Sequence, residues 1–217
     1  QRQMCIRDRF FAEGKNYNYE YFCYYITMTK YILHGGFTSI PNELNRSFYA
    51  ECTKGTKDNG IILLIYFSRK DEEVVKLFEE DKAHLLKQTI VKNLNIVLAE
   101  EDKFSEQLEK ADAIYMRGGS TIKLLKTLKQ YPDFKDKIKG KIVSGSSAGA
   151  YVLAKYFHSA SEGGVLEGLG ILPIRIICHF GSDRFEDRGD PIADLEKYPD
   201  ELRLVVLKDC EWLILEM

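Results

Sequence analysis

Short apolar runs alternate with amphipathic segments along most of the chain. The clearest run, GIILLIYF at 60–67, is apolar at almost every position, which indicates a strand buried on both faces. The same length and composition predict further short strands at 31–34, 95–99, 113–116 and 142–143. Strands that alternate with helical segments at this spacing predict right-handed β-α-β units. We therefore expect a three-layer α/β fold with a mostly parallel central sheet.

The segments between these strands carry signals for the start of a helix. Proline and glutamate early in 41–53 suit the first turn of a helix there. Ser68 with Asp71 resembles a capping box at the start of a long amphipathic helix, and Ser120 can cap another helix. A shorter helix is predicted at 104–111. Each helix would connect two neighbouring strands of the sheet.

The regular alternation of apolar runs and amphipathic segments ends near residue 160. Glycine and charged residues become more frequent, and the apolar runs are separated by polar loops. We predict a loop at 161–170, a strand at 174–179, a polar loop at 181–190, a helix at 192–198, and two strands at 202–207 and 212–215 joined by a turn at Lys208-Asp209.

Residues 1–27 do not follow either periodicity, because aromatic side chains there are interrupted by charged, Asn and Gly residues. We expect an N-terminal extension outside the fold, of the kind produced when a reading frame is opened too early, since Met28 stands directly before the first strand. The remaining residues, 28–217, are predicted to form a single α/β domain. That domain ends on an apolar run with no closing helix, so we expect it to be truncated at its C-terminus.

Composition and charge narrow the possible partners. With 45% hydrophobic and 29% charged residues and a net charge of −2, the chain offers no electrostatic argument for nucleic acid. The longest apolar runs are far shorter than the roughly 20 residues that span a bilayer, so no membrane contact is expected. Five scattered cysteines without a C-x-x-C pair argue against a disulfide framework or a zinc site. We therefore expect a cytoplasmic protein without a metal or other cofactor.

The stretch KIVSGSSAGAYVLAKYF at 141–157 carries the most specific chemical signal. Gly145 to Gly149 fits G-x-S-x-G, the nucleophile elbow, in which a strained turn between a strand and a helix exposes the central Ser147. The flanking glycines are required because a side chain there would collide with the neighbouring strand or helix. The pattern predicts Ser147 as a nucleophile, with an ordinary small-residue turn as the alternative.

A serine nucleophile needs a base, and His179 is the best-placed histidine. It ends a predicted strand and enters a loop, which is the edge of a parallel sheet where α/β proteins place their sites. The other three histidines fit structural or surface positions equally well. The acid that would orient the base is left open by the sequence. The candidates, all in loops around the histidine, are Glu162, Glu167 and Asp183.

Backbone N–H groups are the expected stabilisers of an oxyanion. Gly118 and Gly119 follow a neighbouring predicted strand, and Ala148 follows the nucleophile directly. A tight turn between a strand and a helix explains the two glycines equally well.

Three motifs resemble one family. YMRGGST at 115–121, GSSAGA at 145–150 and ILPIRIICHF at 171–180 are similar to the serine peptidase family that includes dipeptidase E and cyanophycinase. The resemblance extends over roughly 28–215. It implies a flavodoxin-like α/β fold related to class I glutamine amidotransferases, with serine in place of cysteine at the elbow.

The resemblance also implies roles for particular residues. Ser147 would be the nucleophile and His179 the base, while the spacing of the dipeptidase branch places the acid at Glu162. The oxyanion donors would be Gly118 or Gly119 together with Ala148. Family members suggest short acidic peptide substrates, such as those with an N-terminal aspartate, whose carboxylate would be bound by Arg184 or Arg188. We expect a monomer or homodimer that binds only its small peptide substrate.

Three alternatives remain. An esterase-type α/β hydrolase also has G-x-S-x-G, but only 70 residues follow Ser147, and His179 lies only 32 residues after it, too few for that fold. A glutamine amidotransferase would carry cysteine at the elbow. A degenerate member of the family that acts as a binding module would be distinguished by equal activity of the parent chain and Ser147→Ala.

Overall fold

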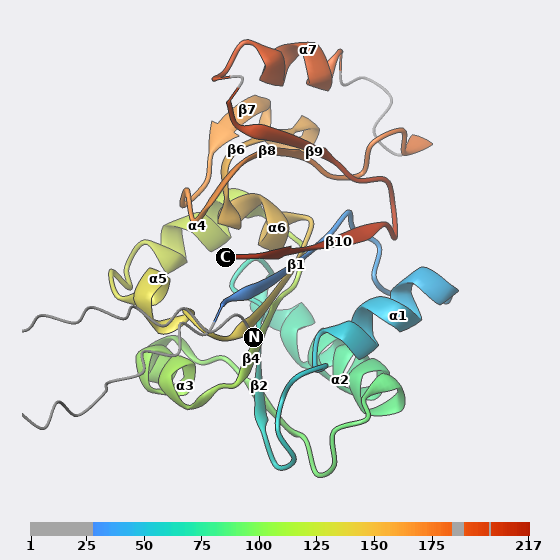
Figure 1. The fold of residues 1–217 in the computed structure, drawn as a ribbon, viewed down its shortest axis with the longest axis vertical. Helices are drawn as coiled ribbons and strands as arrows, with labels where there is room; N and C mark the ends of the chain where they lie inside the picture. Colours follow the sequence, from blue (N-terminus) through green and yellow to red (C-terminus); the bar gives the residue numbers. More distant parts are fainter. Residues whose placement is uncertain (1–27, 184–188, 200) are drawn as a thin grey trace, which may run out of the picture.

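The computed structural model describes residues 28–183, 189–199 and 201–217, and its framework is a six-stranded sheet with strand order β10-β1-β5-β4-β2-β3 (Figure 1). Five neighbouring strands run parallel, and β10 pairs antiparallel with β1 at one edge. The strands of this sheet are β1 (Lys30–His34), β2 (Ile61–Ile65), β3 (Asn95–Leu98), β4 (Ala113–Met116), β5 (Ile142–Ser146) and β10 (Trp212–Glu216). The predicted α/β fold with a mostly parallel sheet is confirmed. The expected N-terminal extension lies outside the described residues.

Helices cover both faces of this sheet, because its strands are apolar on both sides. Alternate residues of one strand point to opposite faces: Ile62 and Leu64 join one buried cluster, whereas Leu63 joins the other. The first cluster contains side chains of α1 and α2, and the second contains side chains of α3 to α6. The helices are α1 (Glu43–Glu51), α2 (Asp71–Gln88), α3 (Phe104–Lys110), α4 (Thr121–Leu128), α5 (Phe134–Lys137), α6 (Ala148–Leu153) and α7 (Pro191–Glu196), with short 3-10 turns η1 (Glu101–Lys103) and η2 (Ala160–Glu162).

A second sheet of four strands, in the order β7-β6-β8-β9, lies above the first, with α6 between the two sheets and α7 on the far side (Figure 1). Its strands are β6 (Ala154–Ser159), β7 (Gly164–Glu167), β8 (Leu172–Ile177) and β9 (Arg203–Val206). Strands β6, β8 and β9 are parallel, and β7 is antiparallel to β6. Phe157, Leu172 and Ile176 of this sheet are buried in the same cluster as α6.

The second sheet corrects one expectation and places one histidine. The segment 161–170 is not only a loop, because β7 forms within it and pairs with β6. The helix of the elbow ends at Leu153, after which the chain is extended as β6. His158 therefore lies in a strand, and its Nε2 is 3.5 Å from Asp194 of α7.

The last two strands are in different sheets. β9 belongs to the small sheet and β10 to the large one, so the turn at Lys208-Asp209 carries the chain from one sheet to the other and does not close a hairpin. Leu207 still continues the pairing of β9, since its N–H donates to Ile177 O. This crossing segment lies beside the elbow.

The start of α2 also differs from the prediction. The helix begins at Asp71, where Glu73 accepts a hydrogen bond from the N–H of Lys70. Ser68 does not cap this helix; its hydroxyl donates to Arg117 O at 2.8 Å. Ser120 caps α4 as predicted, accepting from the N–H of Lys123. The serine of the supposed capping box therefore ties the end of β2 to the end of β4.

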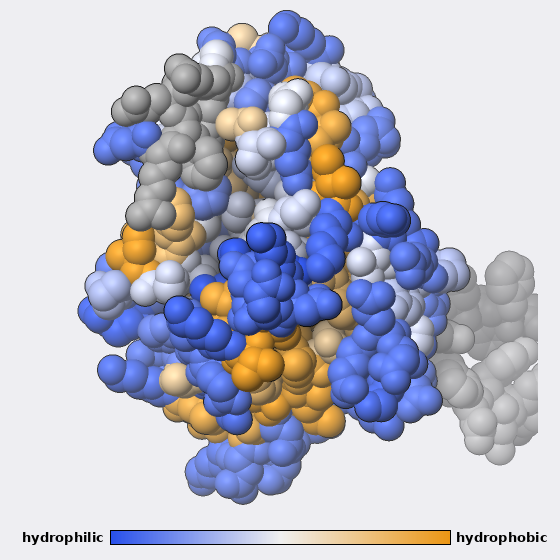
Figure 2. Space-filling view, turned by 180° about the vertical axis from the view of Figure 1, so that it is seen from behind, coloured by the Kyte–Doolittle hydropathy of each residue, from blue (hydrophilic) through white to orange (hydrophobic). Residues whose placement is uncertain are grey.

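The surface is mainly hydrophilic on the face shown in Figure 2, where hydrophobic residues gather in separate areas bounded by charged and polar ones. In the part of the chain that the structure describes, no helix combines the length and the apolar character needed to cross a bilayer.

Candidate active site

Ser147 stands at a sharp corner between β5 and α6. Its backbone angles, φ 49° and ψ −105°, are strained for a residue with a side chain. The two flanking glycines allow the corner to pack tightly. A Cβ on Gly145 would lie 2.4 Å from the carbonyl carbon of Gly149, and a Cβ on Gly149 would lie 2.2 Å from Met116 O. The geometry of a nucleophile elbow, predicted from the glycine spacing, is thus present.

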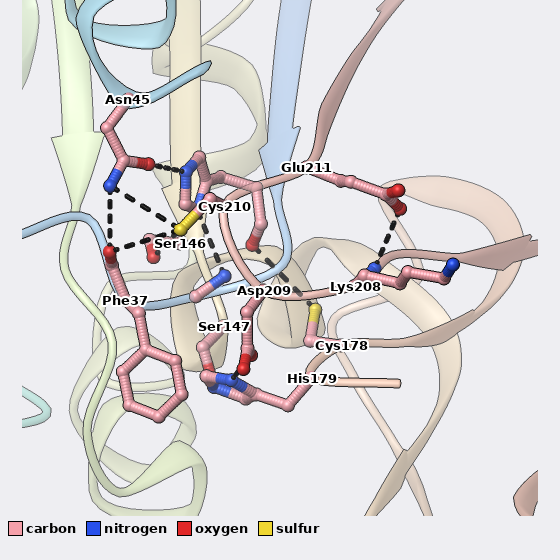
Figure 3. Close-up of polar contacts among 12 residues, drawn as sticks. Phe37, Asn45, Ser146, Ser147, Cys178, His179, Lys208, Asp209, Cys210 and Glu211 are labelled. Carbon is pink, nitrogen blue, oxygen red and sulfur yellow. Dashed lines mark hydrogen bonds and ion pairs between the residues drawn. The ribbon is translucent and has the colours of Figure 1, made fainter. Parts of the chain in front are cut away.

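A chain of hydrogen bonds connects Ser147 to a histidine and a carboxylate (Figure 3). Ser147 Oγ lies 3.0 Å from His179 Nε2, and His179 Nδ1 lies 2.7 Å from Asp209 Oδ1. With Nδ1–H donating to the carboxylate, Nε2 carries the lone pair that accepts the hydrogen bond of the serine hydroxyl. The His179 side chain is 12% exposed and that of Asp209 29% exposed, so the acid is partly hydrated.

Three consecutive carbonyl groups, beginning at the last residue of β1, hold these three segments in place. His34 O accepts from the N–H of Ser147 at 2.9 Å, and Gly35 O accepts from the N–H of His179 at 3.0 Å. Gly36 O accepts at 3.0 Å from the N–H of Cys210, the residue after Asp209. One short segment of main chain therefore aligns the serine, the histidine and the acid.

This segment is itself fixed by a neutral histidine. His34 is fully buried, and its Nδ1 accepts from the N–H of Gly36 at 2.9 Å. Its Nε2 must then carry the proton, which it donates to Asn45 Oδ1 at 2.9 Å. Burial lowers the pKa of His34 from 6.5 to about 4, because desolvation penalises the charged ring. The amide group of Asn45 donates in turn to the carbonyls of Phe37 and Ile40.

The imidazole of His179 is packed against the same loop. A Cβ on Gly36, whose φ is +115°, would lie 1.9 Å from His179 Cε1, so no side chain fits there. The ring of Phe37 also contacts the imidazole in an edge-to-face arrangement, with 4.8 Å between the ring centroids. These contacts restrict the orientation of the imidazole.

The backbone of Gly118 borders the nucleophile. A Cβ on Gly118 would lie 3.2 Å from Ser147 Cβ, whereas one on Gly119 would meet Ser68 O at 2.5 Å. Within the described residues, the N–H groups of Gly118 and Ala148 donate no hydrogen bond to the protein. Of the two glycines that the sequence left open, Gly118 is thus the nearer one to Ser147.

The acid expected from the sequence is elsewhere. Glu162 Oε1 accepts from Ser120 Oγ at 3.3 Å and from the N–H of Ile122 at 3.1 Å, so this carboxylate binds the start of α4. The prediction that it partners His179 is therefore wrong in this structure. Glu167 instead forms an exposed ion pair with Lys155.

Asp209 was not among the residues considered. It lies in the crossing segment between β9 and β10, and the signal that could have found it is its position just after a strand, as for His179. Asp183, the third candidate, lies in the loop after His179, whereas the carboxylate 2.7 Å from His179 Nδ1 is that of Asp209. Arg184 and Arg188, expected to bind substrate, lie outside the described residues.

A cavity of about 310 Å³ opens beside Ser147 and His179. Its walls come from the loops after β1, β2, β4 and β6, all at the carboxyl ends of parallel strands. Gly118, Gly119 and Tyr151 line it near the nucleophile. Among the described residues, no group of three or more His, Cys, Asp or Glu side chains is arranged to hold a metal ion.

The fold and the serine-histidine pair define an α/β protein with a nucleophile elbow, and two solved structures share this fold. One is a peptidase from an acI-B1 Actinobacterium, with 21% identity and a TM-score of 0.64 over 88% of this chain and 84% of that one. The other is a Listeria monocytogenes EGD-e protein whose name gives it as a candidate peptidase E, with 18% identity and a TM-score of 0.64 over 87% and 95% of the two chains.

The family is shown by the sequence. The model of peptidase family S51 matches residues 55–216, so this chain belongs to peptidase family S51, the family of peptidase E and cyanophycinase. It is accordingly a hydrolase of the serine peptidase type. No curated protein matches the chain.

Proposed function

We propose that this protein hydrolyses the peptide bond of short peptides, with dipeptides that carry an N-terminal aspartate as the first candidates, through a triad of Ser147, His179 and Asp209. The observation that carries the proposal is the unbroken chain of hydrogen bonds from Ser147 Oγ through His179 to Asp209 Oδ1. A serine becomes nucleophilic when a base within hydrogen-bond distance removes its proton, and both required contacts are present.

The first half of the reaction forms an acyl-enzyme. His179 Nε2 accepts the proton of Ser147 as Oγ attacks the peptide carbonyl, and the resulting imidazolium is stabilised by Asp209. The backbone N–H groups of Gly118 and Ala148 donate to the oxyanion, supported by their proximity to Ser147 and by their lack of a protein acceptor among the described residues. His179 then gives the proton to the leaving amine.

The second half releases the acid product. A water molecule, deprotonated by His179, attacks the acyl-enzyme carbonyl, the same N–H groups stabilise the second oxyanion, and the proton returns to Ser147 as its bond to the acyl group breaks. Every step uses one imidazole whose tautomer is held by Asp209, so the alignment of His179 is central to the rate.

The proposal is tested with the purified full chain and a panel of dipeptides that differ in the first residue. Ser147→Ala is expected to lower kcat by about 10³-fold or more while leaving the melting temperature unchanged within a few degrees. Ser105→Ala, in α3 and outside the lining of the cavity beside Ser147, is the matched control and should keep full activity.

A second measurement does not depend on choosing the right peptide. A fluorophosphonate probe should label the parent chain once, at Ser147, and should not label Ser147→Ala. Equal hydrolysis by parent and Ser147→Ala, or labelling at another serine, would reject the proposed mechanism.

A further inference from the structure

The charged side chains that line the cavity beside Ser147 are all positive. Two arginines, Arg69 and Arg117, are among its lining residues, and no aspartate or glutamate of the described chain is. A positive group in a cavity that is partly shielded from water attracts anions more strongly than one on an open surface. The two arginines differ, however, in whether their charge is already balanced.

Arg117 forms a buried ion pair with Asp81. Its Nη1 lies 2.6 Å from Asp81 Oδ1, and its side chain is only 8% exposed. Asp81 is fully buried and also accepts hydrogen bonds from Tyr49 at 2.6 Å and Tyr66 at 2.7 Å. Glu80 adds a second carboxylate at 3.7 Å from Arg117. The charge of Arg117 is therefore neutralised by α2, and the side chain is held in position.

Arg69 has no such partner. It forms no ion pair with any described carboxylate, and its Nε is a buried donor without a hydrogen-bond acceptor in the described part of the chain. Its backbone is nevertheless well anchored, because its N–H donates to Tyr66 O and its carbonyl accepts from Lys123. A fixed backbone and an unsatisfied guanidinium together describe a side chain that is ready to bind an anion.

The location of Arg69 connects it to the reacting groups. It follows Ser68, whose carbonyl accepts from the N–H of Ser120 and whose hydroxyl donates to Arg117 O. The loop after β2 is thereby attached to the loop after β4, which contains Gly118. Both loops line the cavity that also contains Ser147 and His179. An anion bound by Arg69 would belong to the molecule that reacts at Ser147.

We propose that Arg69 is a specificity-determining residue that binds a carboxylate of the peptide substrate by a bidentate ion pair. This inference rests on the proposed function, and it places the recognition of the carboxylate on the loop after β2 instead of on the loop after His179. A guanidinium matches the planar carboxylate with two parallel N–H donors, which an ammonium group cannot reproduce. The carboxylate belongs either to an acidic side chain or to the C-terminus of the peptide.

The kinetic test compares Asp-Leu, Asn-Leu and Asp-Leu-amide with the parent chain and Arg69→Gln. We expect Arg69→Gln to lower kcat/KM about 10- to 100-fold for the peptide that carries the recognised carboxylate, mainly through KM. A loss on Asp-Leu that is absent with Asn-Leu identifies the side chain, and a loss that is absent with Asp-Leu-amide identifies the C-terminus. Arg69→Lys should be intermediate, since it keeps the charge but loses the planar fork.

Arg203→Gln is the matched control, because Arg203 is an exposed arginine at the start of β9. It should leave kcat/KM unchanged for all three peptides. Equal losses on all three peptides in Arg69→Gln, or no loss on any, would overturn the proposal. The first result would mean that Arg69 only supports the loop.

A binding measurement separates failure of this inference from failure of the proposed function. Ser147→Ala cannot turn over substrate, so calorimetry with N-acetylaspartate and N-acetylasparagine measures recognition alone. Preferential binding of N-acetylaspartate that Arg69→Gln removes supports the inference even when no peptide is hydrolysed. Equal binding of both compounds, together with retained hydrolysis of both Asp-Leu and Asp-Leu-amide in Arg69→Gln, refutes it while leaving the triad intact.

Discussion

Replacing Asp209 by asparagine tests the identity of the acid directly. The substitution keeps the size of the side chain but removes the charge 2.7 Å from His179 Nδ1. It also replaces a group that only accepts hydrogen bonds by one that can donate, so the imidazole can be held with the proton on the wrong nitrogen. Both effects weaken His179 as a base towards Ser147.

The expected magnitude follows from the charge that the imidazole acquires in the transition state. Two opposite charges with centres about 4 Å apart attract by about 4 kcal/mol at an effective dielectric constant of about 20. Asp209 is 29% exposed, and solvent screening reduces this gain to about 3 kcal/mol. A loss of about 3 kcal/mol lowers kcat/KM roughly 100-fold, and the altered tautomer lowers it further.

The assay measures kcat/KM on an N-terminal-aspartate dipeptide together with the melting temperature. Glu162→Gln is the matched variant, because its amide oxygen can still accept from Ser120 and Ile122. We expect it to stay within about threefold of the parent chain, since an exposed helix-start contact contributes only modestly to stability. Comparable losses in Glu162→Gln and Asp209→Asn at unchanged stability would refute the assignment of the acid.

Two further predictions concern the segment after β1. Gly36→Ala should lower kcat at least 100-fold, because its Cβ would lie 1.9 Å from the His179 ring at a φ of +115°; near-parent kcat in a folded variant would contradict the packing argument. For His34, burial depresses the pKa from 6.5 to about 4, so the neutral ring stabilises the folded state fully above pH 6.5 and this contribution decreases as the pH falls towards 4. Urea unfolding should show the parent chain losing about 2 kcal/mol more than His34→Gln between pH 8 and pH 5, and parallel pH profiles of the two chains would show that His34 does not titrate in this way.

The sequence predicted the large sheet well, because most of its strands are short apolar runs that can only be buried. That β2 is a buried strand follows from the apolar run at 61–65 alone, since both faces of the strand contact helices. The elbow was equally predictable from its glycines. A Cβ on Gly145 would collide with Gly149 in the following helix, and a Cβ on Gly149 would collide with Met116 of β4. The same close contacts require glycine in other nucleophile elbows.

The small sheet was harder to predict. Ala154 to Ser159 follow a helix without a glycine or proline, and their apolar residues fit the continuation of that helix. Pairing with β7 on one side and with β8 on the other makes the segment extended, so contacts between strands override the local pattern.

Asp209 was missed for a related reason. The sequence suggested a tight turn between two paired strands, and a turn aspartate is ordinarily explained by turn geometry. The segment instead connects two sheets, which brings the carboxylate to the carboxyl end of the strand that precedes His179. The spacing along the chain favoured Glu162 as the acid. The carboxylate that contacts His179 is instead determined by which strand ends lie side by side in the fold.

The three carbonyl groups of His34, Gly35 and Gly36 have a consequence for protein engineering. Because they align the serine, the histidine and the acid through main-chain atoms, grafting three side chains onto another scaffold would not reproduce their alignment. A successful transplant would have to carry this tripeptide and its buried histidine as a fourth component, and a search for remote homologues would do better to include the tripeptide than the acid alone.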